Sequence, residues 1–319
     1  MKRVPWWNRT PVSVWFRDLG DVAIGLVPTA FLRAFFKTFT TRPELAEAAG
    51  FHVHPRRFDS PLPVPEEVEM AKLSRPRLLP GIDLRIPPAL ELIRELRRFV
   101  GELDSVPYQA NGSKAFWFDN GSFTDFDAAV LYALLRHLKP KRYVELGCGF
   151  SSLMSSLALE RNHQEGAVCE ASFCDPEPRL DLNLSYGRLV KKRVQDLPLE
   201  MFKALSSGDV LFIDTSHVLK LQSDIEVELL RIMPSLGCGV WIHVHDVFTP
   251  YDYPEDWVKR PVRLAFNEQY ALECLLSGGN RYEVAIPLHC LVRDHTAEMQ
   301  QFFPRGRERA QSFWLRKAG

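Results

Sequence analysis

The chain has 319 residues, 46% of them hydrophobic, which is enough to bury a large core as one domain with an appendage or as two domains. Its 40 basic residues balance 40 acidic ones, so no overall positive field points to nucleic acid as a partner. The six cysteines are scattered without a CxxC pair, which is typical of the reduced thiols of a cytoplasmic protein.

The amino-terminal stretch combines tryptophans with a short apolar run. Trp6, Trp7 and Trp15 precede an uncharged run over residues 22–32, which is well short of the roughly 20 residues that span a bilayer. We predict a helix that packs on the protein's own body or on a second subunit of a homo-oligomer. The alternative is a helix that lies on a membrane surface, as a peripheral contact.

Residues 1–110 are predicted to form an arm or lid with helices rather than a core of their own. The stretches over residues 55–70 and 74–88 are rich in proline, which interrupts helices and strand pairing. One periodic segment predicts a helix over residues 88–102, with apolar side chains on one face. These side chains are Leu90, Ile93, Leu96 and Val100. Residues 111–319 are predicted to form the main domain.

From Ser122 onward, predicted helices alternate with predicted strands. The helix over residues 122–138 has Thr124 or Asp125 as its N-cap. Further helices are expected over residues 152–160, 218–233 and 267–277. Strands are expected over residues 142–147, 171–175, 209–214, 239–246, 282–286 and 312–316, with one more strand-like stretch before Gln195. This alternation predicts an α/β fold, Rossmann-like and doubly wound, with a mostly parallel seven-stranded sheet that binds ligands beyond the carboxyl ends of its strands.

The first of these strands ends in an acidic residue and a glycine turn, Glu145-Leu146-Gly147-Cys148-Gly149. Glycines at this place let the backbone turn tightly and let a ligand lie against the main chain. A dinucleotide-binding loop would place another glycine further on, whereas this sequence has Ser151 and Ser152. The carboxylate of Glu145 would repel a pyrophosphate but suits the ammonium group of an amino-acid tail.

Polar residues follow the next two predicted strands. Asp175 ends the second strand, where a carboxylate can bind both hydroxyl groups of a ribose. The alternative for Asp175 is a helix cap. Gln195 and Asp196 lie in the following loop, where they either meet the edge of an adenine or are simply solvated.

A second group of polar residues follows the later strands. Asp214 ends one strand, His217 comes three residues on, and His245-Asp246 ends the next strand. One interpretation is a divalent cation, Mg²⁺ or Mn²⁺, held by Asp214, His245 and Asp246. A second is metal-free catalysis, in which His217 or His245, beside Asp214, is the general base that deprotonates an acceptor hydroxyl. A third is a structural set in which the histidines only bind the carboxylates by hydrogen bonds.

These motifs resemble those of a known family. ELGCG followed by an acidic strand end is similar to motifs I and II of class I S-adenosylmethionine-dependent methyltransferases. Over residues 122–317 the chain resembles a bacterial branch related to small-molecule and sugar O-methyltransferases, through the successive stretches FCDPEP, QDLP, LFIDTSH, HVHDVF and NEQY. The resemblance implies that Glu145, Gly147 and Gly149 contact the methionine part of S-adenosylmethionine. It implies Asp175 at the ribose and Gln195 and Asp196 at the adenine, while Ser151 replaces a glycine of the same cofactor-binding loop.

The sequence therefore predicts methyl transfer from S-adenosylmethionine to a hydroxyl group of a small molecule or sugar. Two other classes stay open at this point. One is a non-methylating, hydroxylase-like enzyme that binds iron at the second polar group, and the other is a scaffold protein with a vestigial site. Acceptor specificity is expected in residues 50–110 and in the loop after Asp246.

Overall fold

The computed structural model describes residues 28–50, 52–53, 60, 62–110, 112, 115–258, 265–307 and 310–319. The tryptophan-rich start, for which we predicted a packed or membrane-bound helix, lies largely outside the described residues. The chain divides into two units, the first ending at Val68 and the second running from Glu69 to Gly319. Among the described residues, none forms a helix with the length and apolar character needed to cross a bilayer.

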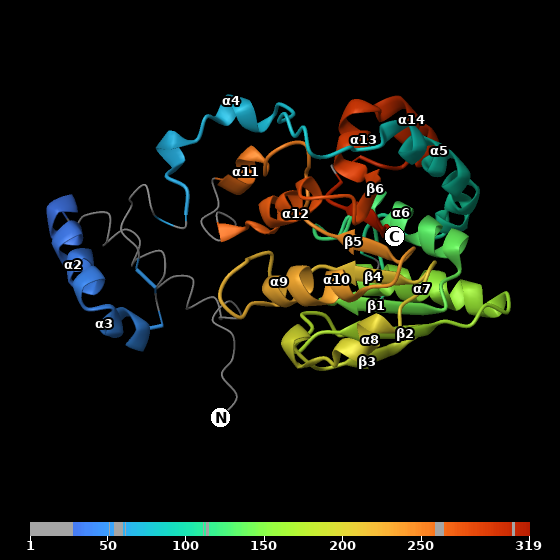
Figure 1. Cartoon of the computed structure of the whole chain (residues 1–319), viewed down its shortest axis with the longest axis horizontal. Coiled ribbons are helices and arrows are strands. Elements are labelled where there is room, and N and C mark those ends of the chain that lie inside the picture. Colours follow the sequence, from blue (N-terminus) through green and yellow to red (C-terminus); the bar gives the residue numbers. More distant parts are fainter. Residues whose placement is uncertain are drawn as a thin grey trace. The chain divides into compact units, whose positions relative to one another are not determined.

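The described part of the first unit consists of short helices (Figure 1). They are α2 (Thr29–Thr41), α3 (Pro43–Ala48) and η1 (Pro65–Glu67). Pro43 occupies the first turn of α3, where its missing N–H costs nothing, and Arg42 separates α3 from α2.

The second unit is built on one seven-stranded sheet with the order β3-β2-β1-β4-β5-β7-β6. The first five strands in sequence pair in parallel, and β7 is antiparallel to both β5 and β6. Their bounds are β1 (Arg142–Leu146), β2 (Glu170–Cys174), β3 (Arg188–Val190), β4 (Val210–Ile213), β5 (Trp241–Val244), β6 (Tyr282–Pro287) and β7 (Phe313–Lys317). The predicted α/β, Rossmann-like, mostly parallel seven-stranded fold is therefore confirmed.

Helices cover both faces of this sheet (Figure 1). Strand β4 shows why, because Val210 and Phe212 belong to one hydrophobic cluster while Leu211 belongs to the other. The first cluster includes residues of α5 (Ile86–Leu96), η2 (Arg97–Leu103), α6 (Asp125–Leu138), α7 (Phe150–Gln164), α13 (Leu288–Asp294) and α14 (Thr296–Phe302). The second includes residues of α8 (Leu199–Lys203), α9 (Asp224–Val227), the π-helical η4 (Glu228–Ile232), α10 (Met233–Ser235) and α12 (Glu268–Ser277). The short elements α4 (Met70–Leu73), η3 (Val194–Asp196) and α11 (Glu255–Val258) lie in connections.

The helix predicted over residues 88–102 forms as α5 and η2, and all four of its predicted apolar side chains are buried. It packs on α6 and β6, so it belongs to the sheet unit and not to a separate arm. For this reason the structure divides after Val68, whereas we predicted a boundary near residue 110.

The helix predicted over residues 218–233 begins later than expected. Ser223 caps α9 by accepting a hydrogen bond from the Glu226 N–H, so residues 214–222 form a loop instead. This loop carries His217 and Gln222 with positive φ angles of 60° and 56°. The change matters because the loop holds part of the candidate site.

Candidate active site

The glycine turn after β1 is wedged between the ends of two neighbouring strands. The Gly147 N–H donates to the Cys174 carbonyl at the end of β2, and the Asp214 N–H donates to the Leu146 carbonyl. Gly147 has a φ of 80°, and a Cβ at this position would lie 1.8 Å from the Asp214 carbonyl oxygen. Only glycine fits there. At Gly149, by contrast, a Cβ would meet no described atom within 4 Å, so the main chain at the start of α7 is open to a ligand.

Glu145 points away from this open edge. Its side chain is fully buried, and its carboxylate accepts hydrogen bonds from Tyr143 Oη (2.5 Å), Ser151 Oγ (2.8 Å) and Ser152 Oγ (2.6 Å). Burial raises the pKa of Glu145 to about 7, although these hydroxyl groups oppose the rise. The expected direct contact between Glu145 and a ligand ammonium group is therefore corrected, because the carboxylate has no exposed surface.

The same geometry explains the serines that replace the later glycines of the loop. Ser152 Oγ accepts from the Gly149 N–H (3.1 Å) and donates to Glu145, so it ties the turn to the buried carboxylate. Ser151 is 2% exposed and is occupied by Glu145, so its hydroxyl is not placed to bind a ligand as we expected. Both residues fix the start of α7.

Asp175 lies beside the glycine turn at the end of β2. One carboxylate oxygen accepts from the Cys148 N–H (2.9 Å) and the other from the Glu177 N–H (2.7 Å). The residue is partly exposed, and each of its oxygens can accept a further hydrogen bond. The structure thus places an accessible carboxylate against the turn, as a ribose site requires.

Gln195 and Asp196 lie in η3, after β3. Gln195 Nε2 donates to the Gln222 carbonyl (3.2 Å), and Asp196 pairs with the exposed Arg193 at 2.8 Å. Gln195 also lines a small cavity of about 260 Å³. Their contact with an adenine stays a prediction.

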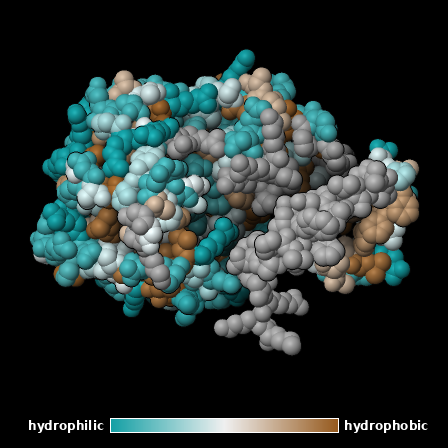
Figure 2. All heavy atoms as spheres, turned by 180° about the vertical axis from the view of Figure 1, so that it is seen from behind, coloured by the Kyte–Doolittle hydropathy of each residue, from teal (hydrophilic) through white to brown (hydrophobic). Residues whose placement is uncertain are grey.

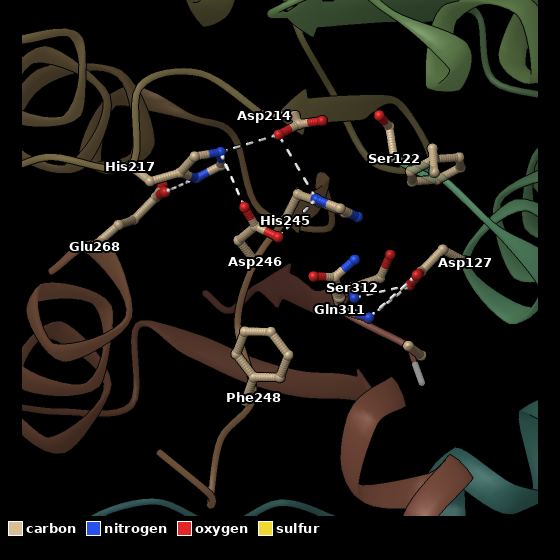
Figure 3. Close-up of polar contacts among 12 residues, drawn as sticks. Ser122, Asp127, Asp214, His217, His245, Asp246, Phe248, Glu268, Gln311 and Ser312 are labelled. Atoms are coloured by element: carbon tan, nitrogen blue, oxygen red, sulfur yellow. Dashed lines mark hydrogen bonds and ion pairs between the residues drawn. The ribbon is translucent and has the colours of Figure 1, made fainter. Parts of the chain in front are cut away.

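Five side chains meet where β4 and β5 end, and we name them the strand-end cluster: Asp214, His217, His245, Asp246 and Glu268 (Figure 3). His217 Nε2 lies 3.2 Å from Asp214 Oδ1 and 3.3 Å from Asp246 Oδ2. His245 Nδ1 lies 3.6 Å from Asp214 Oδ1 and 3.4 Å from Asp246 Oδ1. The structure thus brings together the four residues that the sequence singled out.

Sequence reasoning missed Glu268. This residue opens α12, and its Oε2 lies 2.9 Å from His217 Nδ1, while the backbone N–H of Glu268 donates to the His217 carbonyl. The NEQY stretch contains it, but we assigned it no role, because it lies 51 positions from His217 in a segment that reads as an ordinary helix. Its only signal is an acidic residue at a helix N-terminus, which usually serves the helix dipole alone.

Two members of the cluster have strained backbones. His217 and Asp246 have φ angles of 60° and 58°, a conformation that costs a non-glycine residue about 1–2 kcal/mol. Such conformations persist where surrounding contacts fix them, and they concentrate at functional sites. Here the ion pairs between the two residues and their neighbours supply those contacts.

The cluster holds its histidines in the protonated form. Burial opposes a charge on His245, but the carboxylates of Asp214 and Asp246 outweigh it and raise the pKa of His245 to about 9. Burial likewise opposes the charge on His217, yet Asp246, Asp214 and Glu268 raise its pKa well above the usual value. Burial would raise the pKa of Asp214, but the two imidazoles lower it overall. At neutral pH neither histidine is therefore a ready proton acceptor.

The predicted Mg²⁺ or Mn²⁺ site at Asp214, His245 and Asp246 is not supported. Among the described residues, no group of three or more histidine, cysteine, aspartate or glutamate side chains is arranged to hold a metal ion. The physical reason is that both carboxylates turn their oxygens toward imidazole nitrogens.

Comparison with known proteins identifies the central part of the chain. Residues 144–247, from β1 through the glycine turn to the loop after β5, match the family model described as "Methyltransferase domain". Over these residues the chain is similar to a methyltransferase domain. A curated relative, an uncharacterised protein of Archaeoglobus fulgidus, is 29% identical over 165 residues, which span 48% of this chain and 74% of the relative.

Solved structures similar to the methyltransferase domain show little sequence identity. Human N-acetylserotonin methyltransferase in complex with SAM has 11% identity and a TM-score of 0.35, with 72% of this chain and 56% of that chain covered. An O-methyltransferase from Bacillus cereus in complex with SAH has 12% identity and a TM-score of 0.35, with 72% and 90% covered. With TM-scores this low, neither structure informs the acceptor of this domain.

The residues of the methyltransferase domain fit S-adenosylmethionine. The open main chain at Gly149 gives room for a ligand against the turn, and the accessible carboxylate of Asp175 stands beside it. The positive end of the helix dipole at the start of the 15-residue helix α7 favours a negative group such as the cofactor's carboxylate. These features lie at the carboxyl edge of the sheet, where the glycine turn follows β1 at the point of strand-order reversal and Asp175 follows the neighbouring β2.

Proposed function

We propose that the domain transfers the methyl group of S-adenosylmethionine to a hydroxyl group of a small molecule or sugar unit. The observation that carries this proposal is that Asp214 lies directly against Gly147, so the strand-end cluster and the glycine turn share one edge of the sheet. When bound, S-adenosylmethionine supplies a methyl group already activated on a sulfonium sulfur. The residues of the chain then align the acceptor oxygen and remove its proton.

In this proposal the cofactor is held by main chain and carboxylate contacts. Gly147 and Gly149 let the methionine part approach the backbone, Asp175 binds the ribose, and Gln195 and Asp196 lie toward the adenine. Glu145 acts on the cofactor indirectly, because its contacts with Ser151 and Ser152 fix the first turn of α7. It is a positioning residue.

Asp214 is the member of the cluster that an acceptor hydroxyl reaches most easily. Its side chain is 28% exposed, against 14% for Asp246 and 4% for His245. We assign Asp214 the hydrogen bond to the acceptor hydroxyl, with the two imidazoles keeping it ionised. Once His245 has lost its proton, the Asp214–His245 pair can take the proton that the hydroxyl releases. His217 and Glu268 hold Asp214 and Asp246 in place.

The second unit also offers a cavity of a size that suits a small-molecule acceptor. It has a volume of about 550 Å³ and is lined by α4, by α13 and by the loop after Asp246, with Tyr251 and His289 among its residues. Typical ligand sites have volumes of roughly 300–1,000 Å³. Phe248 connects the cavity to the cluster, since it follows Asp246 by two residues and its ring packs on His289 at 5.0 Å. Acceptor specificity is therefore assigned to the two segments that the sequence analysis named.

The test is the release of S-adenosylhomocysteine in the presence of phenols, catechols and sugars. With an accepted substrate, Asp214→Asn should lower turnover about a hundredfold, because proton removal in a transition state typically contributes at least that factor. Cofactor affinity should stay unchanged. The matched control is Glu200→Gln, which also exchanges a carboxylate for an amide but at a side chain that is 78% exposed on α8. Methylation of amines only, or full turnover by Asp214→Asn, would refute the proposal.

A further inference from the structure

The helix α2 carries a continuous apolar face, which we name the aromatic stripe: Phe31, Leu32, Phe35, Phe36 and Phe39. These residues recur at spacings of one, three and four, which places them on one side of a helix. The rings contact one another, with centroids 4.9 Å apart for Phe35 and Phe39 and 5.6 Å apart for Phe35 and Phe36.

Three of the five residues of the aromatic stripe are exposed, and Leu32 and Phe39 are half-buried. Phe31 is 64% exposed and Phe35 and Phe36 are each 49% exposed, and no residue of α2 is buried. Figure 2 shows the hydrophobic side chains of this helix gathered on its surface. Contiguous exposed apolar surface of this kind marks a site of contact with a protein or a membrane.

The charges of α2 distinguish between these two partners. Arg33 and Lys37 lie on the side of the helix away from the stripe, and α2 contains no acidic residue. The first 42 residues hold seven basic and two acidic side chains, a net charge of +5 in a chain whose total charge is zero. The excess of positive charge in the sequence therefore falls in its first 42 residues, the segment that includes α2.

We infer that the aromatic stripe docks this protein on an anionic lipid surface. A helix with aromatic residues on one face and only cations among its charged residues has the composition of a helix that lies in the plane of a bilayer interface. Each basic residue near an anionic leaflet adds to the attraction. A second copy of α2 fits less well, because it offers no acidic residue to these cations.

The test uses the full chain and vesicle flotation, with vesicles of phosphatidylcholine alone or mixed with phosphatidylglycerol. We expect binding to the mixed vesicles, weaker binding as salt is added, and little binding to phosphatidylcholine alone. The variant Phe35→Glu changes the centre of the stripe, and the matched control Ala34→Glu adds the same charge to the opposite side of α2. Phe35→Glu should bind the mixed vesicles at least about tenfold more weakly than Ala34→Glu, because only the former removes buried apolar area.

Far-UV circular dichroism checks that both variants keep their helices, and binding of S-adenosylmethionine checks that the sheet unit, which holds the proposed cofactor site, remains folded. Three results would overturn the inference: no flotation of the full chain, equal affinity for both kinds of vesicle, or equal loss in the two variants. A stable dimer that Phe35→Glu dissociates, without vesicle binding, would assign the stripe to a second copy and also overturn it. None of these readouts uses methyl transfer, so their failure leaves the proposed function untouched.

Discussion

At the scale of single residues, Glu145 shows how a buried carboxylate shapes the cofactor edge. Its hydroxyl neighbours replace water, yet burial still raises its pKa to about 7 from an ordinary value of 4.5. The stabilisation from an acid with a raised pKa is complete below its unfolded pKa and is lost as the pH rises through its folded pKa.

We predict that the free energy of unfolding falls by about 3 kcal/mol between pH 4.5 and pH 7 because of Glu145. Glu145→Gln should remove most of this dependence, while Glu200→Gln should retain it. Urea unfolding across this pH range measures the effect. An unchanged slope in Glu145→Gln would show that its carboxyl group titrates normally.

The two glycines of the turn should respond differently to alanine. Gly147→Ala places a Cβ against the Asp214 carbonyl at a positive φ, so we expect a loss of about 3 kcal/mol or more in the free energy of unfolding. Gly149→Ala meets no described atom, so its stability should change by less than about 1 kcal/mol while cofactor affinity falls about tenfold. Denaturation and calorimetry measure both quantities, with Gly101→Ala, also in open space, as the control. Normal cofactor binding by Gly149→Ala would argue against the assigned cradle.

His245 sets the pH dependence of the proposed reaction. Because its pKa is raised to about 9, its protonated form predominates at neutral pH, and the neutral form increases about tenfold per pH unit below that value. We predict that turnover rises with pH and levels off near pH 9. The stabilisation from the same ion pairs is complete below pH 6.5 and is lost as the pH rises through 9, so the free energy of unfolding should fall over that range. A turnover that is flat between pH 6.5 and 9 would exclude the Asp214–His245 pair as the proton acceptor.

The identity of the site residues could be predicted further than their orientation. The end of each parallel strand marked Asp175, Asp214 and His245, because such strands deliver their carboxyl ends to one edge of the sheet. The burial of Glu145 could not be predicted, because strand alternation does not say which face meets the serines of α7. The left-handed backbone of Asp246 likewise depends on contacts made by distant segments.

At the scale of elements, α6 holds the last strand in position through Asp127. This buried carboxylate accepts the backbone N–H groups of Gln311 and Ser312, directly before β7 (Figure 3). The hydroxyl of Ser312 in turn lies 2.8 Å from His243 Nε2 on β5, and His243 stacks on Phe212 with ring centroids 3.8 Å apart. The antiparallel end of the sheet is thus tied to the strand that carries His245.

Asp127→Ala should lower the free energy of unfolding by about 3 kcal/mol, because it leaves two backbone donors without their acceptor in a buried place. Asp119→Ala, at an exposed position in the preceding loop, is the matched control and should change it by less than about 0.5 kcal/mol. Chemical denaturation of both variants provides the comparison. A loss below about 1 kcal/mol in Asp127→Ala would mean that water replaces the carboxylate.

Most elements could be predicted from periodicity, and the exceptions have physical causes. The long apolar helix α6 and the strands β1 and β4 repeat their hydrophobic residues regularly enough to be recognised. The helix expected over residues 218–233 loses its first turn because the side-chain amide of Asn267 binds the backbone of Leu219. Asn267 Oδ1 accepts from the Leu219 N–H (2.6 Å), and Asn267 Nδ2 donates to the Leu219 carbonyl (3.3 Å). Such a contact between distant segments has no local sequence signal.

At the scale of the whole molecule, the boundary after Val68 depends on which segments make contacts with the sheet unit. Residues before α5 join the sheet unit because Arg77 pairs with Asp252 at 3.3 Å and also with Glu273. Proline-rich composition suggested an arm up to residue 110, yet proline only excludes regular pairing and does not prevent a segment from packing on a domain. The aromatic stripe lies before this boundary and the whole cofactor edge lies after it.

The central claim is that the glycine turn and Asp175 together hold S-adenosylmethionine, and calorimetric titration of the full chain with this ligand tests it most directly. We predict saturable binding, and a loss of at least about tenfold in affinity for Asp175→Ala, because a hydrogen bond to a charged group is worth about 1.5–3 kcal/mol. Glu177→Ala, an exposed neighbour, should bind like the unmodified chain. Absence of binding at millimolar ligand, or full affinity in Asp175→Ala, would contradict the account.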